Sequence, residues 1–276
     1  MAPLHSVIKR AETFIVSKLS KLPVVAFYSK TRGWPFLIAW AHRITGIILV
    51  LYIWLHIYTL SLLKSPENFD SKMKILGFVL FVLLEWLLSV PVIFHAMNGG
   101  RIILYESFGS RNDNDMIRWV SVLSIIYVLL LGLLMVMGNQ AVSTVFFWIL
   151  ALIASFCLLF LVSEKIRATG NSIYWRLHRI TGAFLLIMVP AHLLFMHLQP
   201  SIGHDSSGII FRMQSVFVKI VDLLLVTCAL YHGSYGMLSI AKDYIESKAF
   251  QTGVAVLVIC IAVVFAWVGI KLTILI

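Results

Sequence analysis

The sequence predicts an all-α integral membrane protein with seven transmembrane helices, built as two parallel three-helix halves joined by a linker helix. Apolar residues make up 61% of the chain and charged residues 12%, a composition outside the range of soluble domains. Seven apolar runs are long enough to cross a bilayer, which takes about 20 helical residues. The pentapeptide His-Arg-Ile-Thr-Gly also occurs twice, beginning at His42 and at His178, as expected for a duplicated unit.

The seven predicted spans define the domain organisation. They cover residues 36–63, 74–98, 116–138, 144–164, 175–199, 214–240 and 252–274. The link between the third and fourth spans is so short that these helices must be antiparallel neighbours. The chain therefore divides into an arm at 1–35, a first half at 36–138, a linker helix at 139–171 and a second half at 172–276. Because the linker helix returns the chain to its starting side, the two halves are predicted to be parallel, with a central four-helix bundle between them.

Basic residues predict the orientation. The arm is rich in lysine and arginine and lacks a long apolar run, which is typical of an amphipathic segment at a membrane surface. With this arm in the cytoplasm, most loop lysines and arginines lie on the same side and the C-terminus lies outside. This orientation accounts for the net charge of +10, because the basic residues lie in short loops between apolar runs. They form no continuous basic face, so no nucleic-acid partner is expected. The tryptophans, Trp148 among them, mostly fall where an aromatic belt is expected.

Histidines occupy matching positions in the two halves. The spacing between His42 and His56 brings both onto one face of a helix at different depths, and the second pentapeptide leads in the same way to His192. A second repeat places His95 and His232 near the ends of the second and sixth spans. Ionisable side chains inside a bilayer are costly and are usually functional or paired, so these histidines are predicted to form pairs at two depths.

Haem iron is the metal centre that such pairs of histidines suit best. Imidazole is a good axial ligand, and pairing His95 with His232 and His56 with His192 predicts two haem b groups. Four small residues beside them would let a flat macrocycle approach the backbone, although glycine also serves helix packing alone. They are Gly46, Gly99, Gly182 and Gly236.

A rival pairing joins His42 with His178 around the first iron. That pairing leaves His95 and His232 without a role. Because an arginine directly follows both His42 and His178, these two positions suit haem propionates better, which need charged donors. A solvated basic helix entrance is the other interpretation of both histidine–arginine pairs.

At these residues the chain resembles the membrane anchor of succinate:quinone oxidoreductase, the cytochrome b part of succinate dehydrogenase and fumarate reductase in respiratory complex II. It is similar to the two small three-helix anchor subunits of that family fused head to tail. The first half resembles the larger subunit in its pentapeptide, in residues 65–69 and in His95 with Gly99. The second half resembles the smaller subunit, with His232 upstream of Asp243 and Tyr244.

The resemblance implies a role for each matching residue. His95 and His232 would ligate the haem nearest the iron–sulfur subunit, with His42, His178 and Arg179 on its propionate side. A quinone site on that side would use Arg43, Asp243 and Tyr244. Tyr244 would hydrogen-bond a quinone carbonyl, Arg43 would polarise it, and Asp243 would orient the arginine or relay protons.

His56 and His192 resemble the second ligand pair of the two-haem members of the family. Electrons could then cross the membrane, which favours a second quinone site and menaquinone over ubiquinone. Glu85 and Asp222 are predicted at the depth of this pair, as carriers of protons for quinone chemistry there or as protonated, hydrogen-bonded carboxyls.

The expected function is electron transfer between the iron–sulfur subunit and membrane quinone in the cell's inner membrane. Dicarboxylate chemistry would belong to a partner flavoprotein, because the chain has neither a flavin-binding motif nor a cysteine cluster. A dihaem anchor of a hydrogenase or formate dehydrogenase is the alternative, and a haem-free transporter or receptor is a more distant one. The sequence leaves open the direction of catalysis and a possible trimer of complexes.

Overall fold

The computed structural model describes residues 33–76, 79–110, 112–167, 169–200, 203 and 205–275, together with scattered positions between 10 and 31. More than half of the predicted arm at 1–35 therefore lies outside the described residues. The elements are α3 (Trp34–Ser61), η1 (Leu62–Lys64), α4 (Pro66–Leu76), α5 (Val79–Phe108), α6 (Asp113–Met137), α7 (Thr144–Arg167), α8 (Ile173–Leu198), α10 (Ser206–Met213), α11 (Val216–Tyr244) and α12 (Lys248–Leu275).

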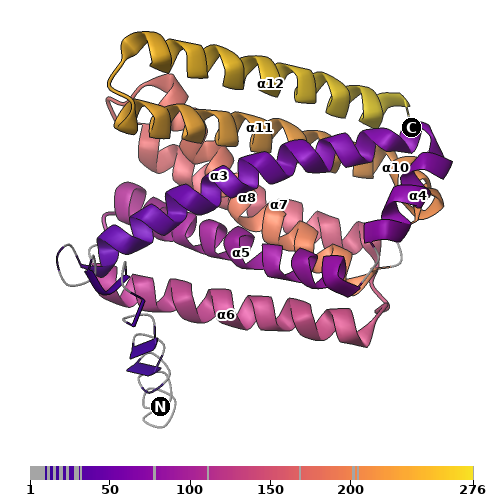
Figure 1. Ribbon diagram of the computed structural model, residues 1–276, viewed down its shortest axis with the longest axis horizontal. Coiled ribbons are helices and arrows are strands. Elements are labelled where there is room, and N and C mark those ends of the chain that lie inside the picture. Colours follow the sequence, from indigo (N-terminus) through magenta and orange to yellow (C-terminus); the bar gives the residue numbers. More distant parts are fainter. Residues whose placement is uncertain are drawn as a thin grey trace.

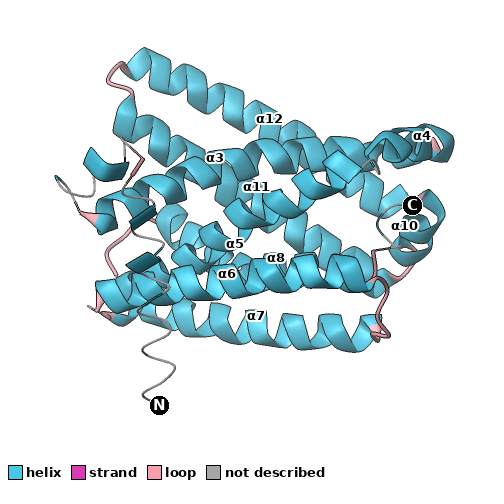
Figure 2. Cartoon of the chain, turned by 60° about the horizontal axis from the view of Figure 1, so that its bottom comes forward, coloured by secondary structure: helices cyan, strands magenta, loops and turns pink. Residues whose placement is uncertain are grey.

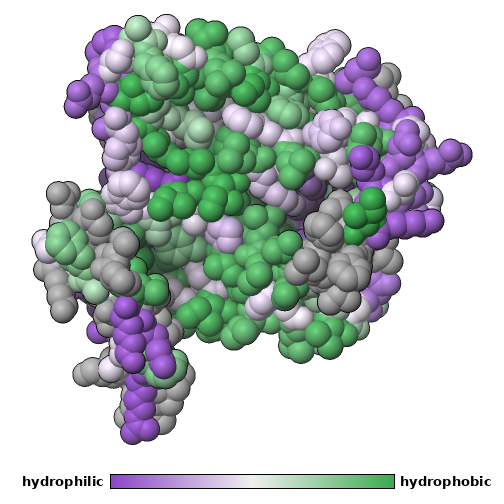
Figure 3. Space-filling view, in the orientation of Figure 1, coloured by the Kyte–Doolittle hydropathy of each residue, from purple (hydrophilic) through white to green (hydrophobic). Residues whose placement is uncertain are grey.

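Seven of the described helices are long and apolar enough to cross a membrane, namely α3, α5, α6, α7, α8, α11 and α12. The described part of the chain contains helices and no strand. Apolar side chains cover the middle of the face seen in Figure 3, and hydrophilic residues gather toward its two ends. The predicted class, an all-α multi-pass membrane protein, is confirmed.

Four helices form the centre of the bundle. α3 packs against α5 and α11, and α8 packs against the same two helices from the other side. α6 lies along α5, α7 along α8, and α12 along α11 and α3, so these three are peripheral. Figure 1 shows α6 and α12 at opposite edges of the bundle, and Figure 2 shows α7 at an edge. The four central helices are the ones that carry the repeated histidines, so the packing turns both histidine stripes toward a common interior.

Two short helices that the sequence analysis did not predict lie at one end of the bundle. Figures 1 and 2 show α4 and α10 together there, at the end opposite the start of α3. The Asp70 carboxylate of α4 accepts hydrogen bonds from the Ser206 amide at 3.0 Å and the Ser206 hydroxyl at 2.8 Å. Leu63, Phe69, Ile209, Met213 and Leu272 form an apolar cluster beside this contact. The two halves are therefore fastened to each other at this end.

The second predicted span was wrong at its end. It was predicted at 74–98, whereas α5 continues to Phe108. Arg101 lies within this continuation, where its Nε donates to Asn98 at 2.8 Å and its guanidinium pairs with Asp113 of α6. With its charge paired, Arg101 stays inside the helix, and the chain leaves the helix at Gly109, where φ is 69°.

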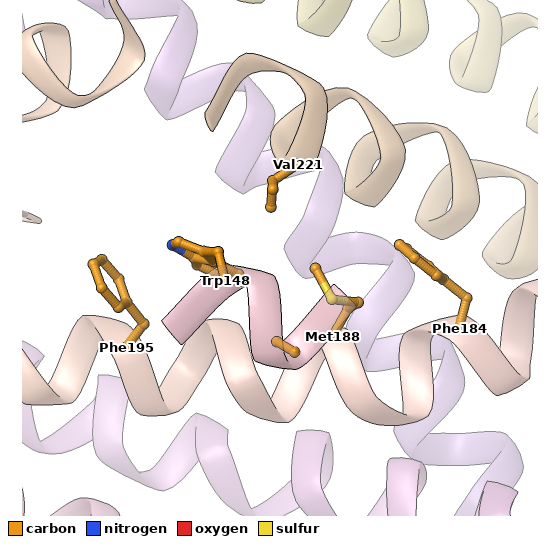
Figure 4. Close-up of a cluster of buried hydrophobic side chains, with 6 residues drawn as sticks. Trp148, Phe184, Met188, Phe195 and Val221 are labelled. Atoms are coloured by element: carbon orange, nitrogen blue, oxygen red, sulfur yellow. The ribbon is translucent and has the colours of Figure 1, made fainter. Parts of the chain in front are cut away.

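Trp148 contradicts the aromatic-belt prediction. Its side chain is 1% exposed and belongs to a cluster between α7, α8 and α11. Figure 4 shows its indole over α8, between Phe195 and Met188, with Val221 of α11 facing it. The linker helix therefore contributes a large side chain to the interior of the bundle.

Candidate functional site

The central helices enclose one large cavity. Its volume is about 1470 Å³, and its lining includes all six repeated histidines. Pockets that hold a single drug-sized ligand are smaller, at roughly 300–1,000 Å³. Arg43 and Asp243 line the cavity at one end, and Arg212 and Asp222 line it at the other. We call these the Arg43 end and the Arg212 end.

Four histidines gather toward the Arg43 end, and we call them the four-histidine layer. The His42 ring stacks on the His95 ring, with centroids 3.9 Å apart, and the His178 ring stacks on the His232 ring at 4.2 Å. His95 and His232 approach each other across the two halves, with centroids 6.4 Å apart and planes at 89°. Each half thus contributes one stacked pair, and His95 of the first half faces His232 of the second.

Backbone carbonyls hold the two facing imidazoles. Nδ1 of His95 lies 3.1 Å from the carbonyl oxygen of His42, and Nδ1 of His232 lies 3.3 Å from that of His178. A carbonyl oxygen only accepts hydrogen bonds, so Nδ1 must carry the proton in both rings. The Nε2 lone pair of each ring is then available as a donor to a metal.

Two of the four candidate glycines are required by the approach of these rings. A Cβ added at Gly46 would lie 3.0 Å from Cε1 of His95, and one added at Gly182 would lie 3.0 Å from Cε1 of His232. At Gly99 and Gly236 the nearest atoms belong to His42 and His178, at an ordinary 3.9 Å. The repeated pentapeptide thus ends in the residue that leaves room for the histidine of the next helix.

His56 and His192 form a second group, the two-histidine layer. Their centroids are 6.4 Å apart and their planes lie at 78°. The His56 ring stacks on Tyr52 at 5.6 Å, whereas His192 lies 6.2 Å from the indole of Trp148. The buried Nδ1 of His192 has no hydrogen-bond partner among the described residues. This layer repeats the spacing of the facing pair without its carbonyl contacts.

The predicted quinone residues come together at the Arg43 end. The Arg43 guanidinium donates to the Tyr244 hydroxyl at 2.6 Å and to the Asp243 carboxylate at 2.9 Å. Trp40 packs edge-on against the Tyr244 ring at 5.6 Å. The Arg43 and Asp243 side chains are 38% and 48% exposed, so the group is open at the surface, and these two residues also line the cavity.

Two further arginines line the cavity near the four-histidine layer. Arg179 makes a two-pronged contact with the Glu106 carboxylate, at 2.6 and 2.9 Å, and a third contact with Nδ1 of His178 at 3.1 Å. Arg101 pairs with Asp113. The sequence alone did not indicate Arg101, Glu106 or Asp113 as site residues. The continuation of α5 past residue 98 would have been the signal, since it carries Arg101 and Glu106 into the site.

The two predicted carboxylates differ in their surroundings. Asp222 lies 3.8 Å from the Arg212 guanidinium, and their side chains are 20% and 13% exposed. Glu85 is exposed at the edge of the cavity that it helps to line. Both face the same cavity as the two-histidine layer. Arg212 was not selected from the sequence.

The fold and the cavity define a class, a multi-helix membrane protein whose interior presents paired imidazoles from two similar halves. The family model "Succinate dehydrogenase/Fumarate reductase transmembrane subunit" matches residues 34–133 and 159–270. The chain belongs to this family. The interruption between the matched segments includes the first part of α7, the helix interpreted as a linker.

A curated relative agrees with this assignment. Over 93 residues, the chain is 31% identical to the membrane subunit SdhC of succinate dehydrogenase 2 from Mycobacterium tuberculosis. The match covers 32% of this chain and 68% of the relative. No solved structure matches the chain at a significant level. The protein is therefore a membrane subunit of the succinate dehydrogenase and fumarate reductase type.

Proposed function

We propose that the chain is the dihaem cytochrome b anchor of a succinate:quinone oxidoreductase, passing electrons between an iron–sulfur subunit and membrane menaquinone. The observation that carries the proposal is the repeated 6.4 Å separation of facing imidazoles, His95 with His232 and His56 with His192. A ring nitrogen binds a first-row metal at about 2 Å, so two axial imidazoles on one iron have centroids roughly 6 Å apart. Both pairs fit this requirement.

The hydrogen bonds favour His95 and His232 over His42 and His178 as the ligands of the first iron. Both facing rings have Nδ1 on a carbonyl oxygen, which leaves Nε2 free. His42 and His178 lie flat against these rings, a position suited to holding the rim of a macrocycle. Arg179, and by its position Arg101, would supply charged donors to propionates. When bound, haem supplies one-electron transfer between the ferric and ferrous states.

The Arg43 end supports a quinone site. Arg43 would donate to a quinone carbonyl, Tyr244 would donate its hydroxyl proton to the same oxygen, and Asp243 would hold the guanidinium in place. The exposure of this group suits a position where a partner subunit covers it. We infer that the flavoprotein and iron–sulfur subunits dock here, on the cytoplasmic face, with the N-terminus on that side and the C-terminus outside.

The second pair supports electron transfer across the membrane. His56 and His192 would hold the second haem, and Glu85 and Asp222 line the same cavity as candidates for proton transfer to a quinone there. A hydrogenase or formate dehydrogenase anchor could share the histidines. It would not require Arg43 to hold Asp243 and Tyr244, which favours the succinate:quinone oxidoreductase.

Haem content per chain tests the proposal. The purified wild-type complex should contain two haems by pyridine haemochrome, and His95→Ala and His56→Ala should each reduce the content to one. Retention of both haems in His95→Ala together with a loss in His42→Ala would establish the rival pairing. A colourless wild-type complex would refute the proposal. Co-purification of flavoprotein and iron–sulfur subunits separates this complex from a hydrogenase.

A further inference from the structure

The Arg212 end of the cavity holds an arginine whose hydrogen-bonding capacity is largely unused. The side chain is 13% exposed, and its buried Nε has no hydrogen-bond partner among the described residues. Within the described part of the chain, one terminal nitrogen has the Met196 sulfur as its hydrogen-bond partner, at 3.6 Å. The other lies 3.8 Å from the Asp222 carboxylate, beyond the roughly 2.7–3.2 Å of a direct hydrogen bond. A buried guanidinium with unused donors is costly unless an acceptor approaches it.

The other arginines of the cavity lack this property. Arg43 donates a hydrogen bond to Asp243, and Arg101 donates one to Asp113. Arg179 donates to the Glu106 carboxylate from two of its nitrogens. Of the arginines that line the cavity within the described ranges, Arg212 alone makes no hydrogen bond to a carboxylate. Its donors therefore remain available to something inside the cavity.

Arg212 lines the same cavity as His56 and His192 of the two-histidine layer. The α10 helix that carries it is fastened to α4 by the two hydrogen bonds between Ser206 and Asp70. The neighbouring Met213 is buried in the apolar cluster between these helices. The helix that carries Arg212 is thus anchored by a contact between the two halves.

We infer that Arg212 binds a carbonyl oxygen of a quinone at this end, with Asp222 orienting the guanidinium. This deepens the proposed function, on which it rests, by naming the donor of the second quinone site. The other acceptor of similar chemistry is a haem propionate. The quinone is favoured because Arg212 lies beside an aspartate of α11, as Arg43 does at the proposed first quinone site.

The Arg43 end provides a comparison for this arrangement. There also an arginine lies against an aspartate from α11, in the same cavity. The two arginines come from different halves, Arg43 from α3 and Arg212 from α10. One cavity thus has an arginine and an aspartate at each end, with the histidine pairs between them.

Quinone binding to the purified complex tests the inference. We would titrate 2-methyl-1,4-naphthoquinone by calorimetry in an Arg43→Gln background, which weakens the competing site, and add Arg212→Gln or Arg212→Lys. Arg212→Gln should weaken binding at least tenfold while both haems are retained. Arg212→Lys should weaken it less, because lysine keeps the charge but loses the planar fork. The matched control is Arg167→Gln, since Arg167 is 79% exposed and pairs with its helix neighbour Glu164.

Each other outcome overturns the inference. Unchanged naphthoquinone affinity in Arg212→Gln would make Arg212 a structural residue. Loss of one haem in Arg212→Gln would assign the guanidinium to the propionates instead. If Arg212→Gln fails to assemble, unchanged affinity in Arg212→Lys overturns it. Failure of the proposed function is distinct, because it appears in the wild type as fewer than two haems, whatever the calorimetry shows.

Discussion

The four-histidine and two-histidine layers have facing pairs with the same separation, yet they are built differently. In the first, each facing imidazole is held by a carbonyl of the pentapeptide helix and passes over a glycine of the same motif. In the second, His56 lies against Tyr52 of its own helix and His192 lies near Trp148 of the linker helix. The first layer follows the duplication, whereas the second depends on residues outside the repeat.

This difference indicates which parts of each layer can vary independently. Replacing the glycine of one pentapeptide alters one side of a symmetric arrangement, and the equivalent replacement in the other half should have the same effect. A change around His192 has no counterpart around His56. Substitutions should therefore separate the two layers, beginning with the largest expected effect.

Gly46→Val should abolish metal binding by the four-histidine layer and leave the two-histidine layer intact. Even the first added carbon would lie 3.0 Å from the His95 ring, and the branched side chain would displace the ring from its facing position. We expect the haem content to fall from two to one, by pyridine haemochrome, and Gly182→Val to do the same. Gly253→Val is the matched control, because a Cβ there meets nothing within 4 Å. Equal losses in Gly253→Val would mean that glycine replacement acts through helix packing alone.

Trp148→Ala should affect the other layer. The indole is buried among Phe195, Met188 and Val221, and truncating a buried aromatic residue costs about 3–5 kcal/mol. We expect a lower unfolding temperature and a broadened or lost signal from the haem at His192, with the His95 haem unchanged in its visible and paramagnetic resonance spectra. Trp119→Ala removes an equally large but exposed side chain and should change neither. Identical changes in both haems would contradict a separate support for the two-histidine layer.

Arg43→Lys should separate catalysis from stability at the Arg43 end. Lysine keeps the charge but cannot reach Asp243 and Tyr244 together, as the planar guanidinium does. A hydrogen bond to a charged group contributes about 1.5–3 kcal/mol, so quinone reduction should slow by roughly 10- to 150-fold. The exposed ion pair itself stabilises the fold by only about 0–1 kcal/mol, so the unfolding temperature should barely change. A large thermal effect with normal turnover would make the cluster structural.

The sequence predicted the features that follow from hydropathy and repetition, and it missed those that depend on helix rotation and distant partners. The spans and the grouping of Arg43 with Asp243 and Tyr244 followed from apolar runs and from the resemblance. Glu106 was missed because its partner Arg179 is 73 residues away and nothing in either segment indicates the pairing. Trp148 was assigned to a belt because sequence position gives depth along a helix but not the direction of the side chain.

The short helices were missed for a different reason. Residues 66–76 are too polar to form a span, and only the packing of Phe69 against Ile209 and Met213 makes this stretch part of a cluster. The charged stretch around Asp70 resembles a solvated loop until Ser206 of the other half is brought against it. Arg212 was overlooked with this region, because its position in the cavity depends on the contact between the halves.

Thr45→Val should produce the smallest effect and test the symmetry of the four-histidine layer. The hydroxyls of Thr45 and its counterpart Thr181 both donate to carbonyls of their own helix, Thr45 to those of Ala41 and His42 and Thr181 to those of Leu177 and His178. In addition, the Thr45 hydroxyl lies 3.3 Å from Nδ1 of His95. Removing an acceptor from the Nδ1 proton makes the imidazole less basic, which stabilises the ferric state less, so the midpoint potential of that haem should rise. A neutral hydrogen bond contributes about 0.5–1.5 kcal/mol, so a redox titration should give a rise of about 20–60 mV. Thr181→Val should leave the potential unchanged, and equal shifts in both variants would mean that both threonines act through the helix backbone.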